Sequence, residues 1–460
     1  MEDTNEECGM VGVVSKKGLS VTPLLYNALV ALQHRGQDAA GFAVLTPDGK
    51  IEERKGLGLV RDVFREDDLG IEGTIGIGHT RYPTTGKCEM CDVQPTLYAG
   101  IAVAHNGHLA NYVALKKRFA KMGRNYMSTV DTEPIAMLLD EKRTEGAESA
   151  VRYLMKTLDG AYSDAAIFES KLLVFRDPHA IRPLVWGENE DFVMFASETV
   201  ALDINDIPYR GMLGGGEMAL LDGESVIRKN IMPKEPHHCM FEYVYFSRPD
   251  SIINNLSVYD ARKRLGAELA REHPVKADVV VPVPDTSRQA AASFAEAFKL
   301  PVEEGLIKNR YIGRTFIMPN QQARSAAVRL KLNPVKEVLE GKRVVLIDDS
   351  IVRGTTLRGI VSLVRAAGAK EVHLRITCPP IKAPCFYGVD MSTYSELIAN
   401  EKSVSEIKTY LGANSLGYLS IEGLKKTLGV PLCTGCLNED YPTEMGRQLA
   451  KERKWPSECG

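Results

Sequence analysis

The chain has 460 residues, of which 44% are hydrophobic and 25% are charged, an ordinary composition for a globular protein with more than one packed core. Its 57 basic residues nearly balance its 60 acidic ones, and the net charge of -3 excludes a general field for nucleic acid or an anionic membrane. No apolar run approaches the roughly 18 residues of a membrane helix, and the acidic start MEDTNEE is unlike a secretory signal. We therefore expect a cytoplasmic, multidomain protein without nucleic-acid or membrane partners.

The first half of the chain is predicted to be strand-rich α+β structure. From Gly9 to about Glu235, short apolar runs such as IGIGHTRY and AGIAVAHNGHL are separated by Gly, Asp and Asn turns. A few amphipathic helical stretches lie between them. We place the boundary of this first domain near Pro233 to Pro236.

Cys8 stands directly before a glycine and an apolar strand in CGMVGVV, where composition alone favours a buried structural cysteine. Four further segments follow it in order: HRGQDAAG at 34–41, GHTRYPTTG at 78–86, HNGHL at 105–109 and VDTE at 130–133. Together these segments resemble the glutamine amidotransferases with an amino-terminal cysteine nucleophile. The resemblance implies an αββα sandwich glutaminase domain at residues 8–235, preceded by a propeptide at residues 1–7.

The resemblance also implies a role for each matching residue. Cys8 would be the nucleophile, and its own α-amine, with a pKa of about 7.7 to 8, would act as general base once the propeptide is removed. Arg81 would pair with the α-carboxylate of glutamine and Asp131 with its α-ammonium. Asn106 and the backbone N–H of Gly107 would form the oxyanion hole. Without the resemblance, each polar residue is better read as part of a solvated turn or a structural salt bridge.

One loop departs from the family pattern. The segment GKCEMCDVQPT at 86–96 contains Cys88 and Cys91 where a small polar loop is expected. The sequence leaves three interpretations open, namely two loop cysteines, a redox-sensitive pair and an adventitious metal site.

The second half alternates apolar runs with helical segments. The runs VVVPVP, RVVLIDDS and VHLRITCPP are separated by the Ala-rich RQAAASFAEAF and LRGIVSLVRAAGA, and a helical DARKRLGAELAREH precedes them. Such βαβ units predict a buried parallel sheet. The second domain is therefore expected to be α/β and to cover residues 236–460.

The segment RVVLIDDSIVRGTTLRG at 343–359 is a strand, two carboxylates and a Gly/Thr-rich turn that opens a helix. It resembles the fingerprint by which type I phosphoribosyltransferases bind phosphoribosyl pyrophosphate (PRPP). Asp348 and Asp349 would then lie at the carboxyl end of a parallel strand and engage the ribose hydroxyls and Mg²⁺. The helix amino terminus would hold the 5-phosphate. The residues at this turn are Arg353, Gly354, Thr355 and Thr356.

A second strand-to-helix turn is VPVPDTSRQAA at 281–291. By resemblance it forms the pyrophosphate loop, with Asp285 and Ser287 as ligands. Many relatives have serine where Thr286 stands, but the hydroxyl is kept, so Thr286 is still assigned to Mg²⁺ and pyrophosphate.

The basic stretch from Lys308 to Lys331 is longer than a connection between βαβ elements requires. We interpret it as a lid over an anionic substrate. Its cations would neutralise the departing pyrophosphate, and closure would form a transient channel for ammonia between the two sites. The candidate cations are Lys308, Arg310, Arg314 and Lys331.

Four cysteines are candidate metal ligands: Cys239, Cys385, Cys433 and Cys436. Structural zinc and a [4Fe–4S] cluster both accept four thiolates. The spacing of the cysteines alone favours zinc. However, the contexts HHCMFEYVYFSRP, APCFYGVDM and LCTGC resemble the iron–sulfur subclass of amidophosphoribosyltransferases. The cluster would be structural and would connect the carboxyl-terminal segment to the domain junction. No role follows for Cys378 or Cys459.

The combined resemblance spans nearly the whole chain and implies one reaction. The amide nitrogen of glutamine would be transferred to PRPP, giving phosphoribosylamine, glutamate and pyrophosphate in the committed step of purine synthesis. It also implies a homotetramer inhibited by purine nucleotides. Two alternatives exist: an amidotransferase serving a sugar-phosphate isomerase, which would lack the IDDSIVRGTT segment, and a PRPP-sensing regulator, which would not need Cys8.

Overall fold

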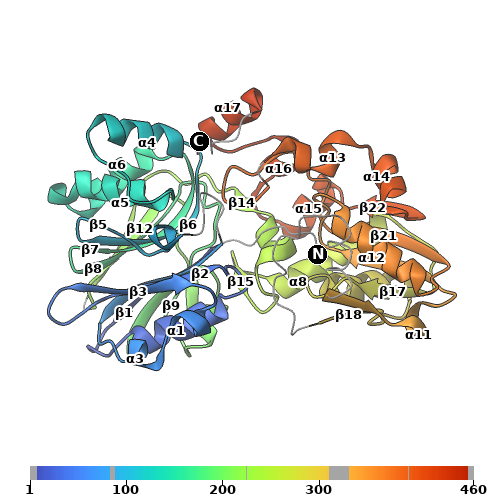
Figure 1. The fold of residues 1–460 in the computed structure, drawn as a ribbon, viewed down its shortest axis with the longest axis horizontal. Coiled ribbons are helices and arrows are strands. Elements are labelled where there is room, and N and C mark those ends of the chain that lie inside the picture. Colours follow the sequence, from blue (N-terminus) through green and yellow to red (C-terminus); the bar gives the residue numbers. More distant parts are fainter. Residues whose placement is uncertain (1–7, 83–88, 224, 310–330, 392, 454–460) are drawn as a thin grey trace.

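The computed structural model describes residues 8–82, 89–223, 225–309, 331–391 and 393–453. Its two halves lie side by side (Figure 1). We call residues 8–235 the first half and residues 236–460 the second half. The division falls between β13, which ends at Asn230, and β14, which begins at His238.

Two antiparallel sheets form the centre of the first half. One sheet has seven strands in the order β11 (Tyr209–Met212), β9 (Val185–Glu188), β10 (Phe192–Ala196), β1 (Gly9–Ser15), β4 (Ile75–Arg81), β2 (Ala39–Leu45) and β3 (Ile51–Leu57). The other has six strands in the order β13 (Val226–Asn230), β12 (Glu217–Leu221), β8 (Lys171–Arg176), β7 (Gly160–Phe168), β6 (Ile101–Leu109) and β5 (Thr96–Tyr98).

The side chains of β1 show how the layers form. Met10 and Val14 pack into the core between the two sheets, whereas Val11 and Val13 pack into the core under the helices of the seven-stranded sheet. Successive side chains of a strand point to opposite faces, so a strand between two cores must be apolar throughout. This explains the unbroken run CGMVGVV.

Helices cover the outer face of each sheet, which confirms the αββα sandwich. The seven-stranded sheet is covered by α1 (Thr22–Ala31), α2 (Val60–Val63), α3 (Glu66–Leu69) and α7 (Val200–Asp203). The six-stranded sheet is covered by α4 (Tyr112–Lys121), α5 (Thr132–Glu141) and α6 (Ala147–Thr157). Two 3-10 turns, η1 (Met90–Asp92) and η2 (Arg143–Glu145), complete this half.

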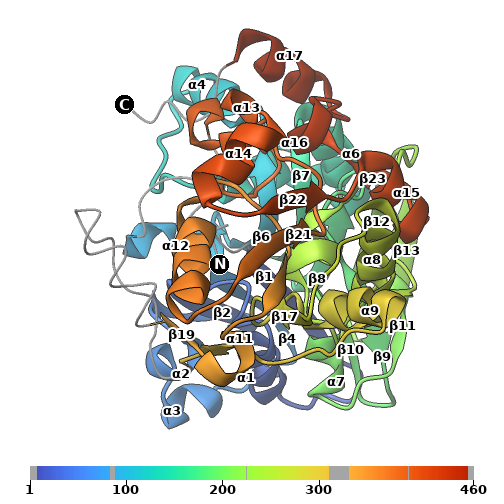
Figure 2. The same ribbon diagram turned by 90° about the vertical axis from the view of Figure 1, so that its right-hand side faces the viewer.

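The second half contains the predicted parallel sheet, with strand order β17 (Val279–Pro282), β20 (Arg343–Asp348), β21 (Glu371–Ile376) and β22 (Ser415–Tyr418). Helices α8 (Val258–Glu272), α9 (Arg288–Phe298) and α15 (Ile421–Leu428) lie on one side, and α12 (Thr355–Ala366) and α14 (Val404–Leu411) on the other (Figure 2). The α/β prediction is therefore confirmed. Helix α8 begins two residues before the predicted segment, because Ser257 accepts a hydrogen bond from the Asp260 N–H and caps it.

Short elements surround this sheet and connect it to the first half. Strands β14 (His238–Cys239) and β23 (Leu432–Cys433) form a parallel pair, and β15 (Ile252–Ile253) with β16 (Leu256–Ser257) and β18 (Leu306–Lys308) with β19 (Leu332–Pro334) form antiparallel pairs. The remaining elements are η3 (Glu242–Phe246), α11 (Lys336–Leu339), η4 (Tyr394–Glu396), α13 (Ile398–Glu401), α16 (Gly435–Asn438) and α17 (Glu444–Glu452).

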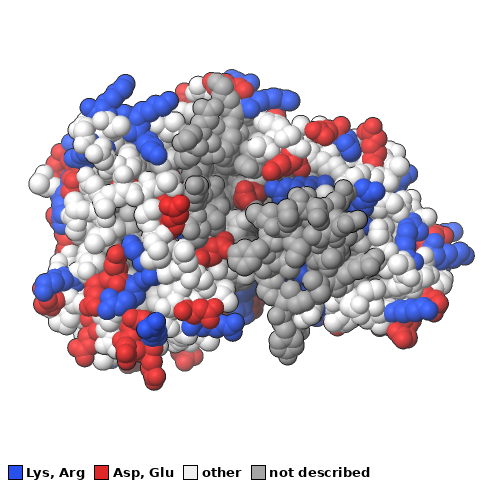
Figure 3. All heavy atoms as spheres, viewed as in Figure 1, with Lys and Arg blue, Asp and Glu red and all other residues white. Residues whose placement is uncertain are grey.

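The surface carries both charge signs. On the face shown in Figure 3, acidic and basic side chains are interspersed, as the near balance of charges in the sequence leads one to expect. In the part of the chain that the structure describes, no helix combines the length and apolar character required to cross a membrane.

Candidate functional site

The first candidate site lies where β1 begins. Cys8 is buried, its thiol donates to the backbone oxygen of Tyr82 at 3.6 Å, and its own carbonyl oxygen accepts from Arg35 Nε at 3.1 Å. Burial raises the pKa of the Cys8 thiol, although the nearby charge of Arg81 opposes this. The resting group is therefore a protonated thiol at neutral pH, and attack on an amide requires a base.

Strands β4 and β6 bring the other predicted residues to the same place. Arg81 is the last residue of β4, beside β1 in the sheet. Asn106 lies in β6, and its Nδ2 donates at 3.2 Å to Ser197 Oγ, which also accepts from the Met10 N–H at 3.0 Å. Asn106 thus lies beside the first residues of β1, although it belongs to the opposite sheet.

Gly107 is required by its surroundings. It has a φ of 151°, and a Cβ at this position would lie 2.0 Å from the backbone oxygen of Ala161. Only glycine fits such a close approach between strands. The backbone of Gly107 is therefore held in place by β7, as a preorganised hydrogen-bond donor must be.

Asp131 immediately precedes α5 and is also buried. Its Oδ2 accepts from the Leu109 N–H at 3.0 Å and lies 3.3 Å from His108 Nδ1 and 3.6 Å from His105 Nε2. Burial opposes ionisation, but the two imidazoles hold the pKa of Asp131 well below its usual range. An ionised carboxylate here suits an ammonium group.

His105 lies between two buried carboxylates. Its Nδ1 is 2.6 Å from Asp164 Oδ1, on the side of the ring away from Asp131. Burial lowers the pKa of His105, but the two carboxylates outweigh it and raise the pKa to about 10. We therefore assign His105 as an imidazolium that balances part of the negative charge around Asp131.

The second candidate site lies at the carboxyl ends of β17 and β20, which pair directly in the parallel sheet. Asp348 ends β20 and Asp349 follows it, and both are buried. The Thr286 hydroxyl donates to Asp349 Oδ2, and the Ser287 hydroxyl donates to Asp348 Oδ1 at 3.5 Å. The structure thus brings the two predicted PRPP segments together, as expected where parallel strands end.

The predicted phosphate turn also has the expected backbone. Gly354 precedes α12 with a φ of 75°, and the helix begins at Thr355 and Thr356. The first N–H groups of a helix have no intrahelical partner and favour an anion. The Arg353 guanidinium lies 3.0 Å from Glu396 Oε2, so this side chain forms an ion pair with η4.

Of the predicted lid cations, two are described. Lys308 Nζ donates to Asp285 Oδ2 at 2.9 Å, which joins the start of the stretch to the pyrophosphate loop. The carbonyl oxygen of Lys331 accepts from the Asn309 N–H at 2.9 Å, so the two ends of the stretch are adjacent. Four predictions concern residues outside the described part of the chain: the propeptide at 1–7, Cys88, Arg310 and Arg314. Cys459, which has no predicted role, also lies outside it.

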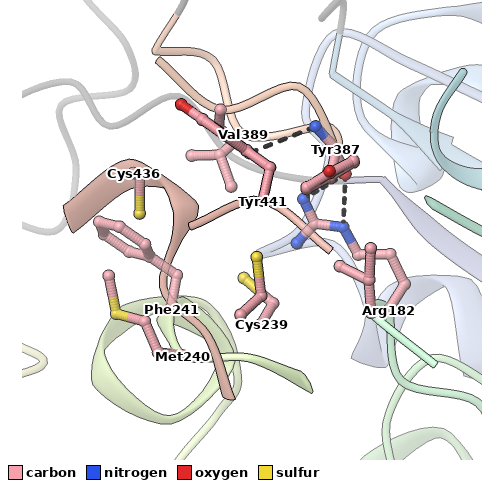
Figure 4. A pocket seen from close by; sticks show the side chains of 11 residues that line it. Arg182, Cys239, Met240, Phe241, Tyr387, Val389, Cys436 and Tyr441 are labelled. Atoms are coloured by element: carbon pink, nitrogen blue, oxygen red, sulfur yellow. Dashed lines mark hydrogen bonds between the residues drawn. The ribbon is translucent and has the colours of Figure 1, made fainter. Parts of the chain in front are cut away.

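The four predicted metal-ligand cysteines line one cavity, together with Arg182, Tyr387 and Tyr441 (Figure 4). Strands β14 and β23 place Cys239 directly beside Cys433. Cys385 and Cys436 come from two further segments.

The chemistry of this cavity is that of buried thiols. Burial raises the pKa of Cys433 to about 12, with a smaller contribution from Cys385. Burial also raises the pKa of Cys436, and the charges of the other cysteines add to it. Among the described residues, no three His, Cys, Asp or Glu side chains are arranged to hold a single metal ion. Cys91 is exposed and lies outside this cavity.

Two further residues belong to the first site, although the sequence motifs assign them no role. His105 and Arg35 both occur in the quoted segments HNGHL and HRGQDAAG. Polar residues in such segments resemble turn residues, and only the tertiary structure shows that both are buried. The signal in the sequence that could have indicated a functional role for His105 and Arg35 is their position within these two motifs.

The comparisons with known proteins identify both domains. A family described as a glutamine amidotransferase domain matches residues 85–203, and one described as a phosphoribosyl transferase domain matches residues 250–410. The fold and the two sites thus define a protein that joins a glutamine amidotransferase domain to a phosphoribosyltransferase domain.

Full-length relatives specify the family. The chain is 46% identical to the amidophosphoribosyltransferase of Methanothermobacter thermautotrophicus, over 98% of this chain and 97% of the relative. It is 43% identical to that of Bacillus subtilis, over 96% and 95%. A solved structure, the B. subtilis glutamine PRPP amidotransferase complexed with ADP and GMP, superimposes with a TM-score of 0.89 at 42% identity, over 95% of this chain and 98% of the other. The chain belongs to the amidophosphoribosyltransferase family.

Proposed function

We propose that the chain transfers the amide nitrogen of glutamine to PRPP and forms phosphoribosylamine, glutamate and pyrophosphate, the first committed step of purine biosynthesis. The observation that carries the proposal is the presence of two complementary sites in one chain. One gathers Cys8 with Arg81 and Asp131, and the other gathers Asp348 and Asp349 with the hydroxyls of the pyrophosphate loop.

At the first site, the Cys8 thiolate attacks the amide carbon of glutamine. Asn106 Nδ2 and the Gly107 N–H stabilise the oxyanion that forms, while Arg81 and Asp131 hold the α-carboxylate and α-ammonium groups. Ammonia leaves, and water hydrolyses the remaining thioester to glutamate. The α-amine of Cys8 is the general base, which requires removal of residues 1–7; intact mass of active enzyme should show a chain that begins at Cys8.

At the second site, ammonia attacks carbon 1 of the ribose as pyrophosphate leaves. Asp348 and Asp349 orient the ribose hydroxyls, and the turn from Arg353 to Thr356 holds the 5-phosphate through backbone N–H groups. The leaving group would lie against the loop of Asp285 to Ser287 and the cations Lys308 and Lys331, and the predicted cation Arg310 would add to their charge. Carboxylate and hydroxyl oxygens in this arrangement suit Mg²⁺, which would neutralise charge on the pyrophosphate.

The cysteine cavity supports a [4Fe–4S] cluster held by Cys239, Cys385, Cys433 and Cys436, as in the iron–sulfur subclass of the family. Burial first, and the neighbouring cysteines second, raise the pKa of Cys436 in this cavity. Binding to cluster iron would stabilise the thiolate forms that burial otherwise disfavours. Neither half-reaction moves electrons, so the role of the cluster is structural.

Purine nucleotides are proposed as feedback inhibitors. The related B. subtilis structure is described as complexed with ADP and GMP, and another at TM-score 0.89 as the allosteric regulatory enzyme of purine biosynthesis. We also propose a homotetramer for this chain.

The test is an assay of pyrophosphate release from PRPP, with glutamine or ammonia as nitrogen donor. Both donors should support release, and glutamate should form in proportion when glutamine is used. Release without incorporation of nitrogen, or binding of PRPP without turnover, would instead indicate a hydrolase or a sensor.

A further inference from the structure

A buried ionic network lies directly behind Cys8 and joins the two halves of the chain. Arg35, in the turn after α1, has a fully buried side chain. Its Nε donates to the carbonyl oxygen of Cys8 at 3.1 Å, one terminal nitrogen donates to Glu198 Oε1 at 2.6 Å, and the other donates to Glu242 Oε1 at 2.7 Å. Glu198 belongs to the first half, but Glu242 belongs to η3 in the second half.

Glu242 is itself held from several directions. Its Oε2 accepts from the Ser247 hydroxyl at 2.6 Å and from Arg35 at 3.0 Å, and Arg182 lies 3.7 Å from its Oε1. Its side chain is 2% exposed. A guanidinium donates in a fixed planar fork, so the two carboxylates determine both the position and the tilt of Arg35. Any displacement of Glu242 therefore changes the contact between Arg35 and Cys8.

The segment that carries Glu242 is fixed to helix α8 of the second half. Arg262, in α8, donates to the backbone oxygens of Tyr243, Tyr245 and Ser247 at 3.0, 2.9 and 2.8 Å. A connected set of contacts therefore runs from the core of the second half to the backbone of the nucleophile.

We propose that Glu242 is a positioning residue for glutamine hydrolysis, although it belongs to the half that binds PRPP. It acts through Arg35, whose Nε fixes the carbonyl group of Cys8 and with it the direction of the thiol. The proposal rests on the proposed function and gives a role to a residue that the motif HHCMFEYVYFSRP contains but to which the sequence assigns none. Small errors in the placement of a nucleophile reduce the rate of attack while leaving a distant site unaffected.

The test compares Glu242→Gln with a matched control, Glu272→Gln. Glu272 is also a carboxylate of the second half, but it accepts from the Ser420 N–H and hydroxyl at 2.8 and 2.7 Å, away from the first half. In Glu242→Gln, the rate of glutamine-dependent synthesis should fall about tenfold. This is the change in rate expected when the transition state loses the free energy of one hydrogen bond to a charged group. Ammonia-dependent synthesis should stay within about twofold of the parent. Glu272→Gln should leave the ratio of the two activities unchanged.

A second measurement separates positioning from stability. Alkylation of Cys8 by an electrophilic glutamine analogue should slow in Glu242→Gln in parallel with glutamine-dependent synthesis. If Glu242→Gln does not fold, Ser247→Ala, which removes only the hydroxyl donor to Glu242, should show a smaller change in the same ratio. Equal loss of both activities, or no loss of either, would overturn the proposal. Failure of the parent enzyme to use ammonia would count against the proposed function, and the alkylation rates would still test Glu242.

Discussion

At the scale of single residues, the environment of Cys8 restricts the choice of base. Burial keeps the thiol protonated, so an adjacent group must remove its proton. Burial lowers the pKa of His79 to about 3, and His105 is already held as an imidazolium. Neither histidine has a pKa near neutrality, where a general base is most effective. The electrostatics therefore favour the α-amine of Cys8 itself as the base.

Cys8→Ala should abolish glutamine-dependent synthesis, because the thioester forms on the sulfur atom of Cys8. Ammonia-dependent synthesis at high pH should persist, since free ammonia can reach the second site from solvent. Steady-state rates with each donor measure both effects. Asp349→Asn is the complementary variant and should reduce both activities by roughly a hundredfold. If Cys8→Ala lost both activities equally while remaining folded, the two sites could not be separate.

His105 makes stability depend on pH. Its folded pKa is raised to about 10, above the value of about 6.5 expected when unfolded. Its contribution to the free energy of unfolding is thus complete below about pH 6.5 and is lost as the pH rises toward 10. His105→Gln should cost on the order of 1–3 kcal/mol at pH 6, and the difference from the parent should shrink by pH 10, as measured by urea unfolding.

His238→Gln is the control for this experiment. Burial lowers the pKa of His238 to about 4, so this ring is neutral over the whole range. The effect of His238→Gln should therefore not change between pH 6 and pH 10. A constant cost for His105→Gln over the same range would show that His105 is neutral in the folded enzyme.

How much of the site the sequence predicts depends on whether a residue lies within a recognisable local motif. Asp348 and Asp349 are predictable because a strand followed by two carboxylates and a glycine turn has a known geometry. Glu242 is not, because its partner Arg35 is 207 residues away and nothing near Glu242 in the sequence indicates a buried ion pair. The protonation of His105 likewise depends on Asp164, which a different strand supplies.

At the scale of elements, the spacing of hydrophobic residues along the sequence predicts most of the main strands and helices of the second half. The runs at β17 and β20 are buried on both faces, so they appear as nearly continuous apolar segments. The pairing of β14 with β23 has no such signal, because two residues form each strand and almost 200 residues separate them. Short strands of this kind are set by tertiary contacts and not by local propensity.

Gly354→Ala should weaken PRPP binding through the start of α12. The φ of 75° disfavours any residue with a Cβ, and the added Cβ would lie 2.9 Å from Ile398 Cδ1. The strain should cost about 1–2 kcal/mol of stability and shift the first N–H groups of the helix. We expect the KM for PRPP to rise about tenfold in the ammonia-dependent reaction.

Gly429→Ala is the matched control for this prediction. Gly429 ends α15 with a φ of 65°, and an added Cβ would meet no atom within 4 Å. Its backbone strain should be similar, but the KM for PRPP should not change. If both variants raised the KM equally, the effect would come from general destabilisation and not from the phosphate turn.

At the scale of the whole molecule, the cysteine cavity lies where the two halves meet. Arg182, from the first half, lines this cavity and donates to the backbone oxygen of Tyr387 at 2.6 Å. A Cβ on Gly388 would lie 3.0 Å from the backbone of Gly107, so the segment that carries Cys385 packs against the proposed oxyanion hole. Ligation at the cavity would therefore fix the carboxyl-terminal segment against both halves.

Anaerobically purified enzyme should contain about four iron and four inorganic sulfide per chain, as a four-thiolate [4Fe–4S] site requires, and it should be brown. Cys433→Ser or Cys436→Ser should lose iron and become unstable or insoluble, because the cluster closes long loops between distant segments of the chain. Cys91→Ser is the control, since this cysteine is exposed and lies outside the cavity. Iron and sulfide analysis with thermal unfolding measures both properties. Stoichiometric zinc without sulfide would show that the cavity holds structural zinc and not a cluster. Loss of metal in Cys91→Ser would show that the metal binds at the loop of residues 86–96 instead.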